Sequence, residues 1–176
     1  IGAFNLAFNA WRQIGHRPLP QLNLACSGLR INAKEEDWTG LAGKDERSRE
    51  TMKRLFLLFR DAPVLASLID PTVLTGTLFS AEFQKVKPLL ERALSVEHED
   101  IVTDELAIAA RGIVRAAQLL CRQFTLVATN VPYLGRGRQD DVLKDHCERV
   151  YPAAKADLAT CMIERSINLC APGGTL

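Results

Sequence analysis

Apolar residues recur at helical spacing along most of the chain, and this spacing predicts most of its structure. Six segments carry the pattern, covering residues 3–14, 44–61, 78–95, 100–122, about 139–149 and about 156–171. In the segment 44–61, charged residues stand together at the start and apolar residues return every three or four positions. Because acids and bases are mixed there, we interpret this helix as a solvated face with one packed stripe rather than a nucleic-acid contact.

Two short apolar runs interrupt the helices and predict strands. The first covers Leu22–Cys26 and ends in a small-residue turn at Ser27-Gly28. The second covers residues 124–129 and leads into a loop punctuated by glycine. Short apolar runs bounded by turn residues are typical of buried strands.

The helices between these strands form an unusually long connection. The polar segment 32–43 is expected to be a loop, with Trp38 as a core anchor and Trp11 playing the same part in the first helix. The helical stretch between the two strands, about 44–122, spans roughly 80 residues, which is long for an ordinary crossover. We therefore predict an α/β fold that is predominantly helical, with a helical insertion at about 44–122 and a motif-bearing part at about 123–176.

The composition is that of one folded domain or a piece of a larger one. Its 176 residues are 47% apolar, and the net charge of +1 gives no global attraction to nucleic acid, so any such contact must be local. No apolar run approaches the roughly 18 residues of a membrane span. The five cysteines form no CxxC pair and their number is odd, so we expect reduced thiols in a cytoplasmic protein and no metal site.

The candidate chemistry lies directly after the second strand. There the amide oxygen of Asn130 and the carbonyl of Val131 can both accept hydrogen bonds from an amino group. Pro132 fixes its own φ and holds the turn, while Tyr133 offers a face for stacking. The stretch 129–134 therefore suggests amino-group chemistry on a planar base, and an ordinary strand-to-loop turn is the alternative.

Two features of the sequence resemble amino-group methyltransferases that use S-adenosylmethionine. Residues 129–134 look like their (N/D)PP(Y/F) motif, and the run 155–165, followed by 171–175, resembles the segment that comes after the motif. A narrower resemblance, to PglX-type adenine-specific DNA methyltransferases of bacteriophage-exclusion (BREX) defence systems, extends over nearly the whole chain. The runs that carry it are Phe8–Arg12, Asn23–Leu29, Asn32–Trp38 and Tyr133–Gly137.

This resemblance implies a fold, a reaction and roles for the motif residues. Such enzymes have a class I (Rossmann-like) core whose doubly wound sheet binds S-adenosylmethionine, and they act on double-stranded DNA with the target adenine flipped out. By resemblance, the Asn130 side chain and the Val131 carbonyl accept hydrogen bonds from the adenine amino group. Pro132 holds the turn and Tyr133 stacks on the base. The contribution is then positioning and charge stabilisation rather than a strong general base.

The chain departs from the family pattern in three places. Val131 replaces the first proline of the motif, although a carbonyl acceptor survives that change. Cys26 and Ser27 stand where related enzymes often place an acidic residue near the cofactor adenine, which makes them the candidate cofactor contacts. The glycine-rich turn and the acidic residue that hold the cofactor have no counterpart, and we expect them upstream of Ile1. With the target-recognition domain expected downstream of Leu176, we predict a fragment that does not turn over alone.

Three charged residues near the motif have two interpretations each. Arg136 and Arg138 could meet phosphates of the flipped strand, or they could lie in a solvated loop. Asp157 could orient groups around the pocket, but we interpret it as an acidic residue that complements the start of the last helix.

Together these patterns predict a partial methyltransferase catalytic domain over residues 1–176. We expect it to come from a site-specific, adenine-specific DNA methyltransferase of bacterial phage defence or restriction-modification. S-adenosylmethionine would be the cofactor, and DNA and other phage-defence proteins the partners, with no membrane contact. Methyltransferases of glutamine side chains or RNA bases carry similar tetrapeptides and are one alternative. A non-catalytic helical interaction module, or a non-functional remnant, is the other, and the missing cofactor turn favours it.

Overall fold

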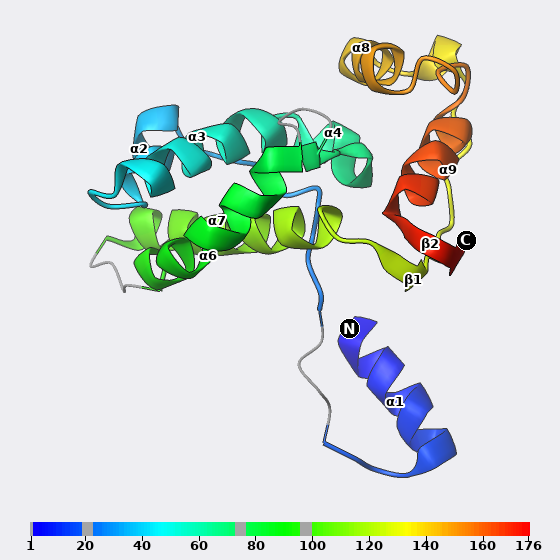
Figure 1. The fold of residues 1–176 in the computed structure, drawn as a ribbon, viewed down its shortest axis with the longest axis horizontal. Helices are drawn as coiled ribbons and strands as arrows, with labels where there is room; N and C mark the ends of the chain where they lie inside the picture. The colour runs from blue at the N-terminus through cyan, green and yellow to red at the C-terminus, as the bar shows by residue number, and fades with distance from the viewer. Residues whose placement is uncertain (1, 19–22, 73–76, 96–99) are drawn as a thin grey trace.

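The chain is mostly helical, with one small sheet near its C-terminal end (Figure 1). The computed structural model describes residues 2–18, 23–72, 77–95 and 100–176. Helix α1 (Gly2–Ile14) lies apart from the other helices in Figure 1. The other elements, in chain order, are α2 (Glu35–Gly40), α3 (Glu46–Phe59), α4 (Ala62–Leu65), η1 (Ala66–Leu68), α6 (Thr77–Ala93), α7 (Ile101–Leu120), β1 (Phe124–Leu126), η2 (Arg136–Arg138), α8 (Asp141–Val150), α9 (Leu158–Leu169) and β2 (Cys170–Thr175).

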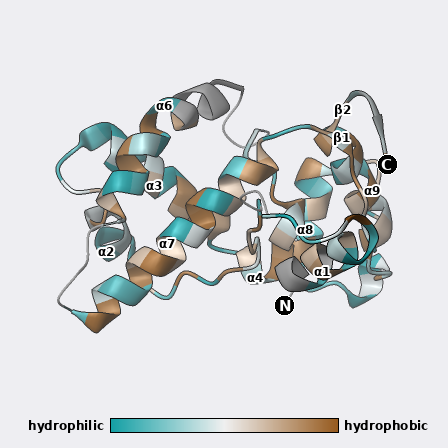
Figure 2. Cartoon of the chain, turned by 90° about the horizontal axis from the view of Figure 1, so that it is seen from below, coloured by the Kyte–Doolittle hydropathy of each residue, from teal (hydrophilic) through white to brown (hydrophobic). Residues whose placement is uncertain are grey.

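Helices α2, α3, α4, α6 and α7, with η1, form the part that we call the helical body. Its hydrophobic and hydrophilic residues alternate along α3 and α7 (Figure 2), and the hydrophobic ones meet in a common core. Trp38 is fully buried there, and its indole N–H donates to the Met52 carbonyl at 2.8 Å. The expectation that Trp38 anchors a core is confirmed, as is the packed stripe on the helix predicted at 44–61.

Local signals explain why the helices begin where they do. An aspartate precedes each of α3, α7, α8 and α9, and its carboxylate accepts a hydrogen bond from a backbone N–H in the first turn. These aspartates are Asp45, Asp100, Asp140 and Asp157. Such caps satisfy N–H groups that have no partner inside the helix. All six predicted helices are present, with ends shifted by a few residues.

The sheet has two parallel strands, β1 and β2. Phe124 is opposite Cys170 and Leu126 is opposite Thr175, so the register shifts between the two pairs. The Val127 N–H donates to the Thr175 carbonyl at 2.9 Å and extends the pairing by one residue. A Cβ added to Gly174 would lie 3.0 Å from the Phe124 carbonyl oxygen, so glycine permits the close approach of the strands.

The structure corrects several sequence-based expectations. Residues 23–26 are irregular rather than a strand, and Leu24 is exposed, because no strand in the described part of the chain pairs with them. Leu22 lies outside the described residues. The segment 170–175 is itself a strand, so the last helix ends at Leu169 rather than near residue 171. The loop expected at 32–43 contains the short helix α2, and Trp11 is only half-buried and outside the common core.

The motif-bearing part, residues 123–176, therefore contains the whole sheet that the structure describes. A helical region precedes it, as expected, but the strand expected before that region is absent from residues 23–26. Within the described residues, no helix is long and apolar enough to cross a membrane. All five cysteines are free thiols.

Candidate functional site

The motif lies on an extended stretch that leaves the carboxyl end of β1. Residues 127–134 are neither helix nor strand and lead to the short helix η2. Asn130 and Pro132 are exposed, Val131 is half-buried, and Tyr133 is 87% exposed. In parallel sheets, ligands bind just beyond the carboxyl ends of strands. The motif residues therefore lie at the end of β1 where parallel sheets bind their ligands.

The polar groups of the motif have no partner elsewhere in the part of the chain that the structure describes. Neither the Asn130 side chain nor the Val131 carbonyl makes a hydrogen bond to another described residue. The Tyr133 ring is in solvent, and its hydroxyl is likewise without a partner there. Two acceptors and an aromatic face are thus available to a ligand that carries an amino group on a flat ring.

The loop after the motif is fixed to the start of α9. The Arg136 N–H donates to the Ala156 carbonyl, and the Leu158 N–H donates to the Leu134 carbonyl, both at 2.9 Å. The side chain of Gln139, which is 3% exposed, also donates to the Leu134 carbonyl at 3.0 Å. These bonds hold the C-terminal end of the motif against α9, while β1 holds its N-terminal end.

Asp157 has a structural part in this clamp. Its carboxylate accepts a hydrogen bond from the Ala159 N–H at 2.8 Å and so caps α9. The interpretation of Asp157 as a residue that complements the helix start agrees with this contact.

The two arginines of the loop differ in their surroundings. The Arg136 guanidinium contacts the Glu148 carboxylate at 2.8 Å, and Lys155 contacts the same carboxylate at 2.5 Å. The Lys155 ammonium, and next the Arg136 guanidinium, hold the pKa of Glu148 below its usual range. Arg138 is exposed, and its side chain has no ion-pair partner among the described residues. Arg138 is therefore free to meet a phosphate, whereas Arg136 would have to leave Glu148 first.

The two candidate cofactor contacts lie in the turn at 26–28. Cys26 is exposed, and the Ser27 hydroxyl lies 3.0 Å from the Ser67 hydroxyl at η1. Neither residue carries the carboxylate that the resemblance leads one to expect near a cofactor adenine. The donor set in this turn therefore fits S-adenosylmethionine poorly, and no cofactor contact is assigned from it.

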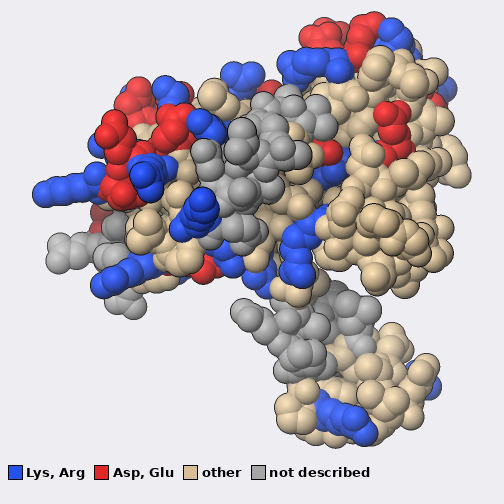
Figure 3. Space-filling model, in the orientation of Figure 1, with Lys and Arg blue, Asp and Glu red and all other residues tan. Residues whose placement is uncertain are grey.

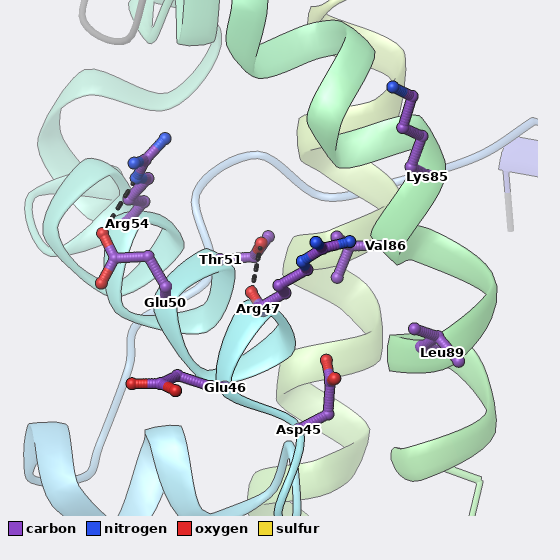
Figure 4. A pocket seen from close by; sticks show the side chains of 9 residues that line it. All are labelled: Asp45, Glu46, Arg47, Glu50, Thr51, Arg54, Lys85, Val86 and Leu89. Atoms are coloured by element: carbon purple, nitrogen blue, oxygen red, sulfur yellow. Dashed lines mark hydrogen bonds and ion pairs between the residues drawn. The ribbon is translucent and has the colours of Figure 1, made fainter.

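A cavity of about 830 Å³ lies between α3 and α6 (Figure 4). Acidic and basic side chains share its lining, and two of them, Glu50 and Arg54, pair with each other at 3.1 Å. Asp45 in the same lining is the cap of α3. Because the lining carries both charges and two of its groups pair with each other, it does not favour binding of a polyanion such as DNA. This agrees with the interpretation of α3 as a solvated face. Histidine, cysteine and carboxylate side chains form no metal-binding group within the described ranges.

Sequence reasoning missed one buried polar pair, which joins α9 to the segment that follows η1. Arg165 on α9 and Asp70 are each 2% exposed, and their Nη1 and Oδ2 atoms are 2.7 Å apart. The signal was present in α9, because Arg165 falls on the same helical stripe as the packed residues Leu158 and Cys161. A charged residue on an apolar stripe indicates a buried partner.

Comparisons with known proteins support the resemblance seen in the sequence, although no protein-family model matches the chain. The adenine-specific methyltransferase BrxX of Escherichia coli O9:H4 (strain HS) is 26% identical over 137 residues, which are 77% of this chain and 11% of that protein. The adenine-specific methyltransferase PglX of Lacticaseibacillus casei (strain Zhang) is 32% identical over 81 residues, 46% of this chain and 7% of that protein.

These matches confirm that the chain resembles the BrxX and PglX methyltransferases. The likeness is distant, and the chain spans only about a tenth of the length of the curated relatives that it matches.

Proposed function

We propose that this chain is the base-gripping part of an adenine-specific DNA methyltransferase. The observation that carries the proposal is the state of the motif. Asn130 and Val131 present acceptors at the end of β1 that no other described residue satisfies, next to the exposed ring of Tyr133. The similarity to two adenine-specific methyltransferases supports the same reaction class.

In the proposed complex, the target adenine leaves the duplex and enters the site from the solvent side of the loop. A base in the stack cannot present its amino group to an enzyme, so flipping is required. Asn130 and Val131 accept the two amino hydrogens, and Tyr133 stacks on the ring. Accepting both hydrogens favours the pyramidal amine and directs its lone pair away from the loop. S-adenosylmethionine supplies the electrophilic methyl group when bound.

The proposed fold context is a class I, Rossmann-like core that includes β1 and β2. Two parallel strands do not make a stable sheet by themselves, and parallel sheets are normally buried on both faces. In the described structure the sheet has two strands, and Leu126 in β1 is 66% exposed. We propose that further strands complete this sheet, with the helical body as an insertion before β1.

The proposed partner is double-stranded DNA, in the setting of bacterial phage defence. Arg138 is the proposed phosphate contact, since its charge is exposed and unpaired among the described residues. The two relatives are named for adenine, which favours this interpretation over glutamine or RNA methylation.

The test is the substitution Asn130→Ala in the intact protein. Removing the side-chain acceptor should reduce methyl transfer to DNA adenine by a hundredfold or more, on the order of losing a transition-state hydrogen bond. The exposed side chain has no partner among the described residues, so stability should be unchanged. Transfer of a radiolabelled methyl group measures the first expectation and thermal unfolding the second. Wild-type methylation in the variant would refute the role of Asn130.

A further inference from the structure

Arg165 joins three segments that are far apart in the sequence. Its Nη1 contacts Asp70 at 2.7 Å, its Nη2 donates to the Leu120 carbonyl at 2.8 Å, and its Nε donates to the Ser67 carbonyl at 3.4 Å. Each guanidinium nitrogen therefore has a partner, on the end of α7, in η1 and just after η1.

The partner carboxylate is held in place as well. Oδ1 of Asp70 accepts hydrogen bonds from the Thr72 N–H at 2.9 Å and from the Thr72 hydroxyl at 2.6 Å. Both oxygens of Asp70 are thus occupied, and the pair is buried with its polar atoms satisfied.

A buried ion pair is weak evidence for added stability, because the cost of removing both charges from water offsets most of the attraction. What the planar guanidinium does supply is direction, since its donors point along fixed lines to several acceptors at once. The contacts of Arg165 therefore fix the orientation of α9 relative to the end of α7.

That orientation sets both ends of the motif-bearing loop. Leu120 ends α7 shortly before β1, whose carboxyl end leads into the motif. Arg165 lies about two helical turns beyond Leu158, whose N–H donates to the Leu134 carbonyl at the far end of the motif. Arg165 thus connects the segment that enters the motif with the helix that receives it.

We infer that Arg165, with Asp70, is a positioning residue that holds the loop 127–139 in the geometry needed to grip a base. That the loop grips a base rests on the proposed function, whereas the effect of Arg165 on the position of the loop does not. Arg165 touches no ligand group itself and acts through α7 and α9.

The experiment is amide-resolved hydrogen exchange of the full chain carrying Arg165→Lys. Lysine keeps the positive charge beside Asp70 but cannot also donate to the Leu120 and Ser67 carbonyls from the same positions. The amides of Val127, Arg136 and Leu158 hold the ends of the loop. In the variant they should exchange about tenfold to a hundredfold faster, which is the factor expected when a hydrogen bond to a charged group is removed. Amides in the middle of α3 and α7 should change much less.

The matched control is Arg149→Lys, because Arg149 is an exposed arginine on the neighbouring helix α8. This variant should leave the exchange of the loop amides unchanged. If Arg165→Lys accelerated the exchange of the amides in α3 and α7 by the same factor as that of the loop amides, the role of Arg165 would be purely structural. That result would overturn the inference. Unchanged exchange at the three loop amides would overturn it as well.

Steady-state kinetics of the same variant distinguish this inference from the proposed function. In the intact protein, Arg165→Lys should lower kcat for adenine methylation more than it raises KM for DNA, since the loop is misplaced while the side chains proposed to meet DNA are all still present. If Asn130→Ala methylates normally, the proposed function fails while the exchange result stands. If the loop amides of Arg165→Lys are unaffected, the positioning role fails whatever the methylation shows.

Discussion

The helical body and the motif-bearing part are built differently. In the body, the largest side chains, such as Trp38, Phe59 and Phe83, are fully buried. In the motif-bearing part, large apolar side chains remain exposed on α9 and in β1, among them Ile167 at 57% and Leu126 at 66%. Figure 3 shows charges of both signs over α2 and α3, whereas the face over α9, β1 and β2 is nearly free of them.

The contrast indicates that the two parts have different roles. The body holds most of the largest fully buried side chains and presents charge of both signs to water, although Leu57, Ile101 and Ile108 on its helices are exposed as well. A surface with few charges and several exposed apolar residues is typical of a place where another surface packs. The groups proposed to grip a base therefore lie on the less covered part, and the ion pair of Arg165 and Asp70 ties that part to the body.

The largest expected effect would come from breaking the core of the body. Trp38→Ala removes a fully buried side chain together with the indole N–H that donates to the Met52 carbonyl. We expect a loss of about 3–5 kcal/mol in the free energy of unfolding, measured by urea titration. Tyr133→Ala is the comparison in the motif, and because Tyr133 is 87% exposed its cost should stay within about 0.5 kcal/mol. Equal losses would contradict the difference between the two parts.

A smaller effect is expected where the two strands approach. In Gly174→Ala the added Cβ would lie 2.9 Å from the Ala171 carbonyl oxygen and 3.0 Å from that of Phe124, so the strands must move apart. We expect a cost of about 1–3 kcal/mol, seen as faster exchange of the Val127 amide, which donates to Thr175. Gly137→Ala is the control, because a Cβ there meets nothing within 4 Å. Similar exchange in both variants would show that the strand contact is loose.

The sequence predicted the helices well because their signals are local. Apolar spacing and the capping aspartates, such as Asp100 and Asp140, lie within the helix or one residue before it. The start of β2 at Cys170 was missed because Pro172, Gly173 and Gly174 usually end an element, and only pairing with the distant β1 makes them a strand. At residues 23–26 a strand was predicted from a short apolar run, but no strand among the described residues pairs with it.

The candidate site divides in the same way. Asn130, Val131 and Tyr133 were found because the motif is contiguous, and the structure shows their groups exposed or unpaired; their roles in binding a base stay predictions. The pairing of Arg136 with Glu148 depends on how the loop folds against α8, and that of Arg165 with Asp70 joins residues 95 positions apart. Contacts over such separations have no signature in a local pattern.

The smallest expected effect concerns the junction between the two parts, where α8 packs near α4. His146 on α8 is 3% exposed, and neither of its ring nitrogens has a hydrogen-bond partner among the described residues. The Leu68 carbonyl nevertheless lies near enough to favour the protonated imidazole. Burial, and then the nearby Arg149 guanidinium, lower the pKa of His146 below its ordinary value of 6.5, while Leu68 and the Asp61 carboxylate oppose that shift.

The sign of the pH dependence follows from this shift. Below about pH 6.5 the unfolded chain binds a proton at this histidine more readily than the folded chain does, so stability should fall as the pH drops from about 7.5 to about 5.5. In His146→Gln that fall should be smaller, because glutamine does not titrate. Urea titrations at each pH measure the slope, and an unaltered slope in His146→Gln would mean that the junction tolerates a charged imidazole.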